Sequence, residues 1–497
     1  MIFLCLYPDW LYDSVHELMR MAFPGEEMKL FKEDNVPDGP QISMRLEANP
    51  GVVKIAAWLD DGDRPGSEYR QSFVTTPGAE APLNEQKQLA RMFTFDMLAR
   101  HLGKRINAYG ILTGMRPVKL VHRFIDRGQD QNSVLKELTG TYRLESDKAG
   151  LLWEVASNNR PFLPEPEAGR RSISVYVGIP FCPSRCHYCS FPGAVLRDYL
   201  RDITPFMEAL GKEIVAIGQE VADLGLNVQT VYIGGGTPTV LSEEDLQRLF
   251  ELLQRWFISS ATTEITVEAG RADTLNQSNL NLLKRLGVNR LCVNPQTMND
   301  HTLQTIGRHH DVKGVVQSVE WAWEAGIEKV NMDLIVGLPG EGPGENTYTA
   351  QQILKLKPEN ITVHTLAIKR GASMSGSPGI RVSTEARERE VMQGVDYFAV
   401  QLRDAGYIPY YLYRQKYMRA SMENTGYSLP GSFCLYNIQM IEERQTILGL
   451  GGGAASKFVV PGTWDLTSAY NPRDPYSYCQ SLETLIGRKV DKLRALH

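Results

Sequence analysis

The stretch SISVYVGIPFCPSRCHYCSFPG, residues 172–193, carries three of the chain's seven cysteines within eight positions. Its first part, 172–179, is rich in β-branched residues and predicts a strand, because such side chains pack well on a pleated sheet. The thiols of Cys182, Cys186 and Cys189 follow in a loop. Thiolates are ligands of iron–sulfur clusters and of zinc, so this loop is predicted to hold a metal centre.

Two kinds of metal centre fit three cysteines. Closed zinc sites usually pair two CxxC motifs or add histidines, and this chain has no second CxxC. His187, between two of the cysteines, is poorly placed to point inward with them. Three thiolates on a four-iron cluster leave one iron open to a small molecule. The spacing therefore favours a [4Fe–4S] cluster, with zinc and unrelated structural cysteines as the alternatives.

Downstream of residue 172 the sequence alternates between strand-like and helical stretches. This alternation predicts βαβ crossovers and a parallel sheet. We therefore expect an α/β fold, a partial (β/α)6 barrel, with a doubly wound sheet as the alternative. The expected strands are 172–179, 228–235, 263–269, 290–294, 330–337 and 361–368, and the expected helices include 243–257, 278–287 and 312–326.

The segments on either side of this core have other patterns. Three strand-like runs and an amphipathic helix predict an N-terminal α+β domain over residues 1–160. Residues 161–171 are rich in proline and charge and indicate a linker. We expect the barrel core over 172–375 and a C-terminal α+β extension over 376–497.

Composition limits the partners. A chain of 497 residues is too long to fold around one hydrophobic core, so two or three domains are expected. A net charge of −5 gives no nucleic-acid footprint, and no apolar run reaches the roughly 18–20 residues of a membrane span. The N-terminal MIFLCLYPDWLYD has no basic region and is interrupted by Asp9 and Asp13, so it is interpreted as a strand and helix rather than a signal peptide. We expect a cytoplasmic protein without a disulfide framework.

Glycines and polar residues follow the expected strands. The motif YIGGGTPTVL, 232–241, contains Gly235, Gly236 and Thr237, and glycines let a ligand approach the backbone closely. The alternative is a plain turn between strand and helix.

Polar side chains also stand at later strand ends. Glu268 ends the third expected strand, Gln296 follows the fourth and Asp333 lies in the fifth. Polar side chains at successive strand ends converge at a barrel mouth. Arg308 offers a bidentate contact to a carboxylate. Helix capping or exposure to solvent is the alternative for each of them.

The spacing CxxxCxxC, with Tyr188 before the last cysteine, resembles the signature of the radical S-adenosylmethionine (SAM) superfamily. In that family three cysteines hold a [4Fe–4S] cluster whose open iron chelates SAM. One electron then cleaves SAM to methionine and a 5′-deoxyadenosyl radical, so the cofactor carries the difficult chemistry. The resemblance implies Cys182, Cys186 and Cys189 as the metal ligands.

Residues 172–460 resemble, more closely, the oxygen-independent coproporphyrinogen III oxidases and their HemZ-type branch. The blocks YIGGGTPTVL, RLCVNPQTMND, IGRHH and NMDLIVGLPG match in order and spacing, and HTLAIKRGA matches the HemZ type. The SAM contacts that this resemblance implies are Tyr176 and Tyr188 beside SAM, Gly235, Gly236 and Thr237 at its amino end, Glu268, Gln296, Arg308 and Asp333 on its ribose and carboxylate, and Ile335 and Ala367 at its adenine.

The reaction implied by the resemblance is oxidative decarboxylation of two propionates of coproporphyrinogen III to the vinyl groups of protoporphyrinogen IX, in haem biosynthesis. A flavodoxin or ferredoxin is the implied reducing partner. Four cations among tyrosines suit a tetrapyrrole with carboxylates: Lys369, Arg370, Arg414 and Lys416. The alternative is an amphipathic edge strand whose tyrosines pack on the barrel.

The chain departs from the family at two positions. Ser190 stands where other oxidases carry a further, non-ligand cysteine, and Tyr436 replaces a histidine of related haem chaperones. Two alternatives remain beside the oxidase: a haem-binding or haem-trafficking protein without oxidase activity, and a radical SAM enzyme that acts on another tetrapyrrole. Tyr436 favours the oxidase over the chaperone.

Overall fold

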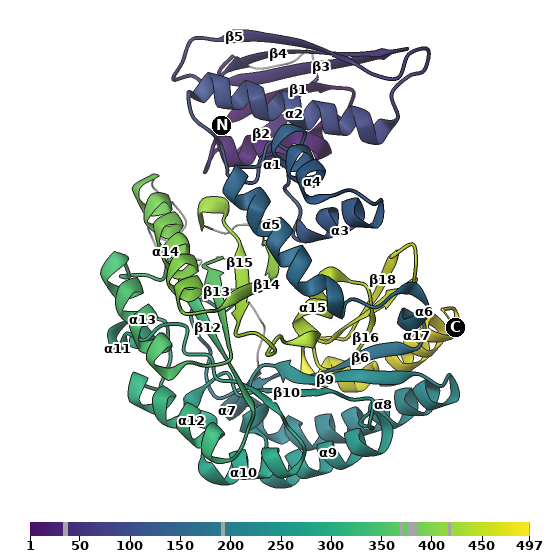
Figure 1. The fold of residues 1–497 in the computed structure, drawn as a ribbon, viewed down its shortest axis with the longest axis vertical. Coiled ribbons are helices and arrows are strands. Elements are labelled where there is room, and N and C mark those ends of the chain that lie inside the picture. Colours follow the sequence, from purple (N-terminus) through teal and green to yellow (C-terminus); the bar gives the residue numbers. More distant parts are fainter. Residues whose placement is uncertain are drawn as a thin grey trace. The chain divides into compact units, whose positions relative to one another are not determined.

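The structure is a computed structural model that describes most of the chain as two compact units, Met1–Trp153 and Glu154–His497 (Figure 1). No helix among the described residues is both long and apolar enough to cross a membrane. The described residues are 1–32, 38–189, 194–367, 372, 374, 385–415 and 419–496.

The N-terminal unit is built on one mixed sheet with the strand order β2-β1-β3-β4-β5. In β3, Ile42, Met44 and Leu46 are buried and their neighbours are more exposed, so one face of the sheet packs on the core. Its elements are β1 (Ile2–Tyr7), α1 (Leu11–Ala22), β2 (Met28–Leu30), β3 (Gln41–Asn49), β4 (Val52–Asp60), β5 (Ser67–Val74), α2 (Leu83–Leu102), α3 (Val118–Asp126), α4 (Gln131–Gly140) and α5 (Ser146–Asn159), which continues into the second unit.

The second unit contains the expected parallel sheet. Six strands lie side by side in the order β13-β12-β11-β10-β9-β6, and every neighbouring pair is parallel. The α/β prediction and its partial barrel of six strands are confirmed. These strands are β6 (Ser172–Ile179), β9 (Asn227–Gly235), β10 (Glu264–Glu268), β11 (Arg290–Cys292), β12 (Lys329–Val336) and β13 (Asn360–Thr365).

Helices cover the outer side of this curved sheet (Figure 1). In α9, Leu246, Leu249, Phe250 and Leu253 are buried, the apolar stripe that the sequence predicts. Polar caps fix where helices begin; the Ser242 hydroxyl accepts from the third residue of α9. The helices are α6 (Pro166–Gly169), α7 (Leu196–Tyr199), α8 (Ile203–Asp223), α9 (Glu243–Trp256), α10 (Gln277–Arg285), α11 (Asp300–Thr305), α12 (Val312–Glu324), α13 (Pro343–Leu356), α14 (Glu385–Asp404), α15 (Leu435–Glu442), α16 (Pro475–Gln480) and α17 (Leu482–Arg494).

The C-terminal strands extend the sheet at both edges. β16 pairs in parallel with β6, and β15 pairs antiparallel with β13. The residues expected as a C-terminal extension therefore share a sheet with those of the expected barrel core. The additional strands are β14 (Ile408–Tyr413), β15 (Asn424–Ser428), β16 (Thr446–Gly451), β17 (Ala455–Val459) and β18 (Leu466–Tyr470), and a separate pair is formed by β7 (Phe181–Cys182) and β8 (Ala194–Val195).

Candidate functional site

The cysteine loop begins directly after β6, at the carboxyl ends of the parallel strands. Cys182 lies in β7 and its Sγ is 3.8 Å from the hydroxyl of Thr237. The pKa of the Cys182 thiol is raised to about 11, chiefly by burial and in part by the nearby thiols of Cys189 and Cys186, while the hydrogen bond from Thr237 opposes the rise. The three thiols are thus close enough to interact electrostatically.

The glycine motif at the end of β9 packs closely against Cys182. A Cβ on Gly236 would lie 2.3 Å from the carbonyl oxygen of Phe181 and 2.9 Å from Cys182 Sγ. Gly235 has φ of +110°, a conformation that side chains rarely adopt. The N–H groups of Gly236 and Thr237 donate to the carbonyls of Ile179 and Phe181. Only glycine lets this turn approach the cysteine loop so closely.

Arg271 holds the cysteine loop from the other side, and the sequence reasoning missed it. Its guanidinium donates to the Ser184 hydroxyl at 2.7 Å and lies 3.8 Å from Cys186 Sγ. Asp273 orients it with two contacts of 3.1 Å. A signal was available, because Arg271 follows the third strand end by three residues. The positive charge of Arg271 opposes the rise that burial causes in the pKa of the Cys182 thiol.

His187 packs against the end of α11. Its Nδ1 lies 3.0 Å from the Thr305 carbonyl, and a Cβ on Gly307 would lie 3.0 Å from its ring. The backbone N–H of His187 donates to the Ile306 carbonyl. This arrangement uses His187 to attach the loop to α11, and it offers no support for a zinc site made of three cysteines and this histidine.

Tyr188 and Arg308 form a second attachment of the loop. Arg308 is 6% exposed, and its NH2 group donates to the Tyr188 hydroxyl at 2.7 Å. Its NH1 group donates to the carbonyls of Gly270 and Asn294 at 2.6 and 2.7 Å. Of the three side-chain nitrogens of Arg308, only Nε lacks a hydrogen-bond partner among the described residues. The expected contact of Arg308 with a carboxylate stays a prediction.

Three predicted residues meet through their backbones. The N–H of Gln296 donates to the Asp333 carbonyl at 2.9 Å, and the N–H of Ile335 donates to the Gln296 carbonyl at 2.8 Å. Gln296 has φ of +73°. Positive φ at a residue other than glycine is stored strain that clusters at functional sites. The structure therefore places Gln296, which follows β11, beside Asp333 and Ile335 of β12, and the convergence of the polar side chains stays a prediction.

Glu268 lies at the end of β10 among tyrosines. Its Oε1 accepts from the Tyr232 hydroxyl at 2.7 Å, and its Oε2 accepts from the Gly235 N–H at 3.3 Å. Burial raises the pKa of Glu268 to about 7, and the charge of Asp333 also raises it, while both hydrogen bonds oppose the rise. A carboxyl with a pKa near neutrality changes charge in the physiological range.

Tyr176 belongs to a stack of three rings that includes Tyr232 and Tyr436. The centroids of Tyr232 and Tyr436 are 4.3 Å apart with planes at 25°, and Tyr176 lies 6.0 Å from each of them. The sequence reasoning noted Tyr436 only as a replacement for histidine. Nothing in the chain's local pattern indicates that Tyr436, which comes from α15, stacks on tyrosines of β6 and β9.

A polar chain continues from Asp333 along the carboxyl ends of the strands. His364 Nε2 lies 3.6 Å from Asp333 Oδ2, and His364 Nδ1 lies 3.3 Å from the Tyr413 hydroxyl. The sequence reasoning named neither His364 nor Tyr413 individually as a site residue. Ala367, expected at the adenine, is half-buried two residues beyond β13.

Of the four cations predicted to contact the substrate, the structure describes one. Lys369, Arg370 and Lys416 lie outside the described residues. Arg414 is 6% exposed and donates to the Ser421 carbonyl at 2.8 Å. The nearby Tyr410 is fully buried in edge strand β14, as the alternative interpretation expects.

The donor set fits an iron–sulfur cluster. Among the described residues, no three histidine, cysteine or carboxylate side chains gather closely enough to hold a metal ion. The thiols of Cys182, Cys186 and Cys189 nevertheless share one loop and interact. A four-iron cluster separates its thiolate ligands more widely than a single ion does. The glycine motif contacts this loop at Cys182, and Arg271 contacts it at Cys186.

Known proteins resemble the chain over different lengths. Residues 176–352 match the radical SAM superfamily. The chain is 38% identical over 492 residues to the oxygen-independent coproporphyrinogen-III oxidase-like protein HemZ of Bacillus subtilis, covering 99% of this chain and 97% of that protein. It is 37% identical over 198 residues to the heme chaperone HemW of the same organism, covering 39% of this chain and 51% of HemW. This second match spans about half of HemW.

The chain also resembles the coproporphyrinogen III oxidase of Escherichia coli, in sequence and in fold. The oxygen-independent coproporphyrinogen III oxidase is 32% identical over 197 residues, covering 40% of this chain and 42% of the oxidase. The solved structure of E. coli coproporphyrinogen III oxidase (HemN), described as a radical SAM enzyme, has a TM-score of 0.52 at 23% identity and covers 66% of this chain and 72% of that one. At this identity the likeness shows the fold.

Proposed function

Since this chain belongs to the radical SAM superfamily and, within it, to the HemZ-type branch of the oxygen-independent coproporphyrinogen III oxidase family, we propose that it converts coproporphyrinogen III to protoporphyrinogen IX. The observation that carries the proposal is the 38% identity to HemZ over nearly the whole of both chains. The match to the heme chaperone HemW covers only 39% of this chain.

The cofactors follow from the family: a [4Fe–4S] cluster and SAM. The proposed ligands of the cluster are Cys182, Cys186 and Cys189. When bound, the cluster and SAM supply a 5′-deoxyadenosyl radical that abstracts hydrogen. Thr237 and Arg271 orient the loop through their contacts with the Sγ atoms of Cys182 and Cys186.

The strand ends provide the proposed SAM site. Glu268 offers a carboxylate to the ribose hydroxyls, held by the hydrogen bonds from Tyr232 and Gly235. Asp333 offers a second one, next to His364. Gly235, Gly236 and Thr237 take the amino end of SAM, and Arg308 its carboxylate. The remaining proposed contacts are Tyr176, Tyr188, Gln296, Ile335 and Ala367.

The substrate in this proposal is a macrocycle with four carboxylates. Each of two propionates would give a hydrogen atom to the 5′-deoxyadenosyl radical and one electron to an external electron acceptor, release carbon dioxide and become a vinyl group. Cations with flat aromatic neighbours suit such a molecule, and Arg414 is the described member of the predicted group.

The test uses anaerobically reconstituted protein with dithionite, SAM and coproporphyrinogen III. We expect 5′-deoxyadenosine together with a tetrapyrrole that is lighter by two carbon dioxide molecules and four hydrogen atoms, both measured by mass spectrometry. Formation of 5′-deoxyadenosine with an unchanged tetrapyrrole would mean that the chain cleaves SAM but that coproporphyrinogen III is not its substrate.

The similarity to HemW favours one second function, haem binding. Haem titration distinguishes the two. A Soret band that saturates at one haem per chain, without any change in coproporphyrinogen, would support haem trafficking. Tyr436 is buried and stacked on Tyr232, so it is not presented to a haem.

A further inference from the structure

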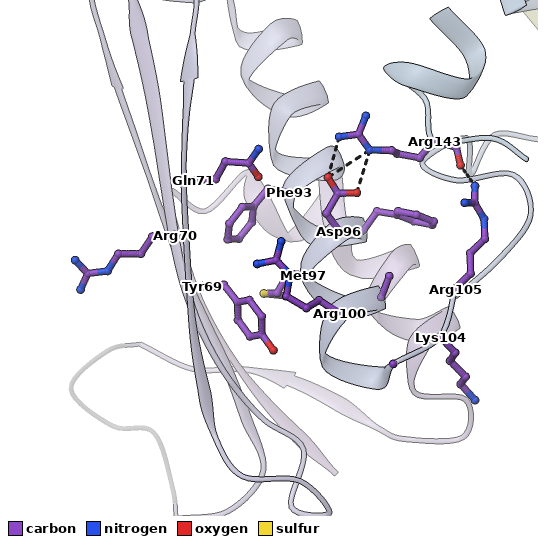
Figure 2. A pocket seen from close by; sticks show the side chains of 13 residues that line it. Tyr69, Arg70, Gln71, Phe93, Asp96, Met97, Arg100, Lys104, Arg105 and Arg143 are labelled. Atoms are coloured by element: carbon purple, nitrogen blue, oxygen red, sulfur yellow. Dashed lines mark hydrogen bonds and ion pairs between the residues drawn. The ribbon is translucent and has the colours of Figure 1, made fainter. Parts of the chain in front are cut away.

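The N-terminal unit contains a cavity of about 730 Å³ that the proposed function does not use. Ligand pockets have volumes of about 300–1,000 Å³. The cavity is lined by β5, by the C-terminal half of α2, by the segment after α2 and by Arg143 (Figure 2). All of its walls belong to Met1–Trp153, so the cavity is complete within one unit.

The charge of the lining is positive. Five basic residues and one acidic residue contribute to it. The acidic residue, Asp96, is held by Arg143 through contacts of 3.0 and 2.8 Å, so its charge is compensated. Arg70 points away from the other side chains in Figure 2 and pairs with Glu68. The remaining cations give the cavity a net positive charge.

Arg100 is the cation available to a ligand. It lies in the last turn of α2, and within the described residues its guanidinium has no hydrogen-bond or ion-pair partner. In contrast, Arg105 is already engaged, because it donates to the Asn107 carbonyl at 3.1 Å and lies over the ring of Phe95 at 5.2 Å. A guanidinium without a partner is suited to bind a carboxylate or phosphate bidentately.

Apolar side chains accompany Arg100. Figure 2 shows Tyr69, Phe93 and Met97 grouped near Arg100 between β5 and α2. Tyr69 is half-buried, and its ring is held in place because its hydroxyl lies 3.2 Å from His101 Nδ1. Fixed aromatic rings offer a surface on which a flat ring system packs.

We propose that this cavity binds a small organic anion that carries carboxylate or phosphate groups on a flat ring system. The acidic group contacts Arg100 and the ring packs against Tyr69. Two sources share this chemistry: a nucleotide and a carboxylated tetrapyrrole. The proposal is independent of the barrel chemistry, since every residue that it uses lies in the N-terminal unit.

The test is calorimetric titration of the full chain with adenosine diphosphate and, separately, with coproporphyrin III. The variants are Arg100→Glu and its matched control Arg123→Glu, because Arg123 is also an exposed arginine in the last turn of a helix of this unit. Both substitutions disturb a helix end in the same way, and thermal melting checks that they do so equally.

We expect one of the two anions to bind the wild-type chain and the control, and its affinity to fall at least about tenfold in Arg100→Glu, because the attraction becomes a repulsion. The anion that does so identifies the source. A Cys182→Ala chain should bind it unchanged, which separates this site from the barrel. The proposal is overturned if neither anion binds, or if Arg100→Glu binds both as the control does.

Discussion

Tyr232 donates a hydrogen bond of 2.7 Å to the carboxyl group of Glu268 across the neighbouring strands β9 and β10. The same carboxyl accepts from Gly235 in the glycine motif. Glu268 therefore connects the third strand end to the turn that lies beneath Cys182. Its surroundings raise its pKa to about 7, chiefly through burial.

The raised pKa of Glu268 predicts a pH-dependent affinity for SAM. Above pH 7 the group is ionised and accepts strongly from the ribose hydroxyls, whereas below pH 7 it is protonated. We expect the Kd for SAM to be roughly tenfold higher at pH 6 than at pH 8. Equilibrium binding across this range measures it. In Glu268→Gln the dependence should disappear, and an unchanged profile in that variant would assign it to another group.

Removal of the Tyr232 hydroxyl should move this pH profile. Its hydrogen bond lowers the pKa of Glu268, so Tyr232→Phe raises that pKa and shifts the midpoint above pH 7. The ring remains and keeps its contact with Tyr436. Tyr413→Phe is the control, because its hydroxyl is near His364. The prediction is contradicted if the midpoint of the pH profile moves in Tyr413→Phe or stays unchanged in Tyr232→Phe.

Each cysteine of the loop should be required for the cluster. We expect alanine at Cys182, Cys186 or Cys189 to remove most of the iron and to abolish reductive cleavage of SAM, since each thiolate supplies one iron ligand. Iron analysis and quantification of 5′-deoxyadenosine measure the two effects. Cys479→Ala is the control, since this thiol is near the Pro205 carbonyl. Full SAM cleavage by any one loop variant excludes that residue as a ligand.

Arg271→Ala should weaken the cluster without removing a ligand. The guanidinium contacts Ser184 and Cys186 in the loop, and its loss frees the loop and removes a positive charge. We expect the iron content to fall and the reduced cluster's electron paramagnetic resonance spectrum to change. Arg248→Ala on the surface of α9 serves as the control. A normal spectrum with full iron in Arg271→Ala would remove this positioning role.

The stability of the barrel unit should depend on a buried ion pair. Glu213 and Lys489 are 0% and 1% exposed, and Glu213 also accepts from the Gly451 N–H and the Tyr478 hydroxyl at 2.7 Å each. Lys489→Met leaves a buried carboxylate uncompensated, which costs about 3–5 kcal/mol. Urea unfolding measures the loss. A second change, Glu213→Gln, should restore part of it; no recovery would contradict the charge explanation.

The six parallel strands were predictable because their apolar runs are local and periodic. Every expected strand lies within one or two residues of an observed one, except that β13 ends at Thr365, earlier than 368. Helix α9 could be predicted for the same reason, since its buried stripe repeats at helical spacing.

The sequence by itself determined the residues that lie near one another along the chain. The thiols of Cys182, Cys186 and Cys189 share one short loop, so their spacing alone predicts a metal centre. Glu268, which ends the third expected strand, and Asp333, which lies in the fifth, could be chosen as candidates because parallel strands place their carboxyl ends at one edge.

Only the tertiary structure decided which distant groups meet. Tyr436 comes from α15 and stacks on Tyr232 of β9, and Arg271 follows β10 yet reaches Cys186. The cavity at Arg100 likewise requires β5 and α2 to pack together. Such contacts join segments with no shared local pattern, because they are set by how the chain packs to bury its apolar faces, and no local periodicity encodes them.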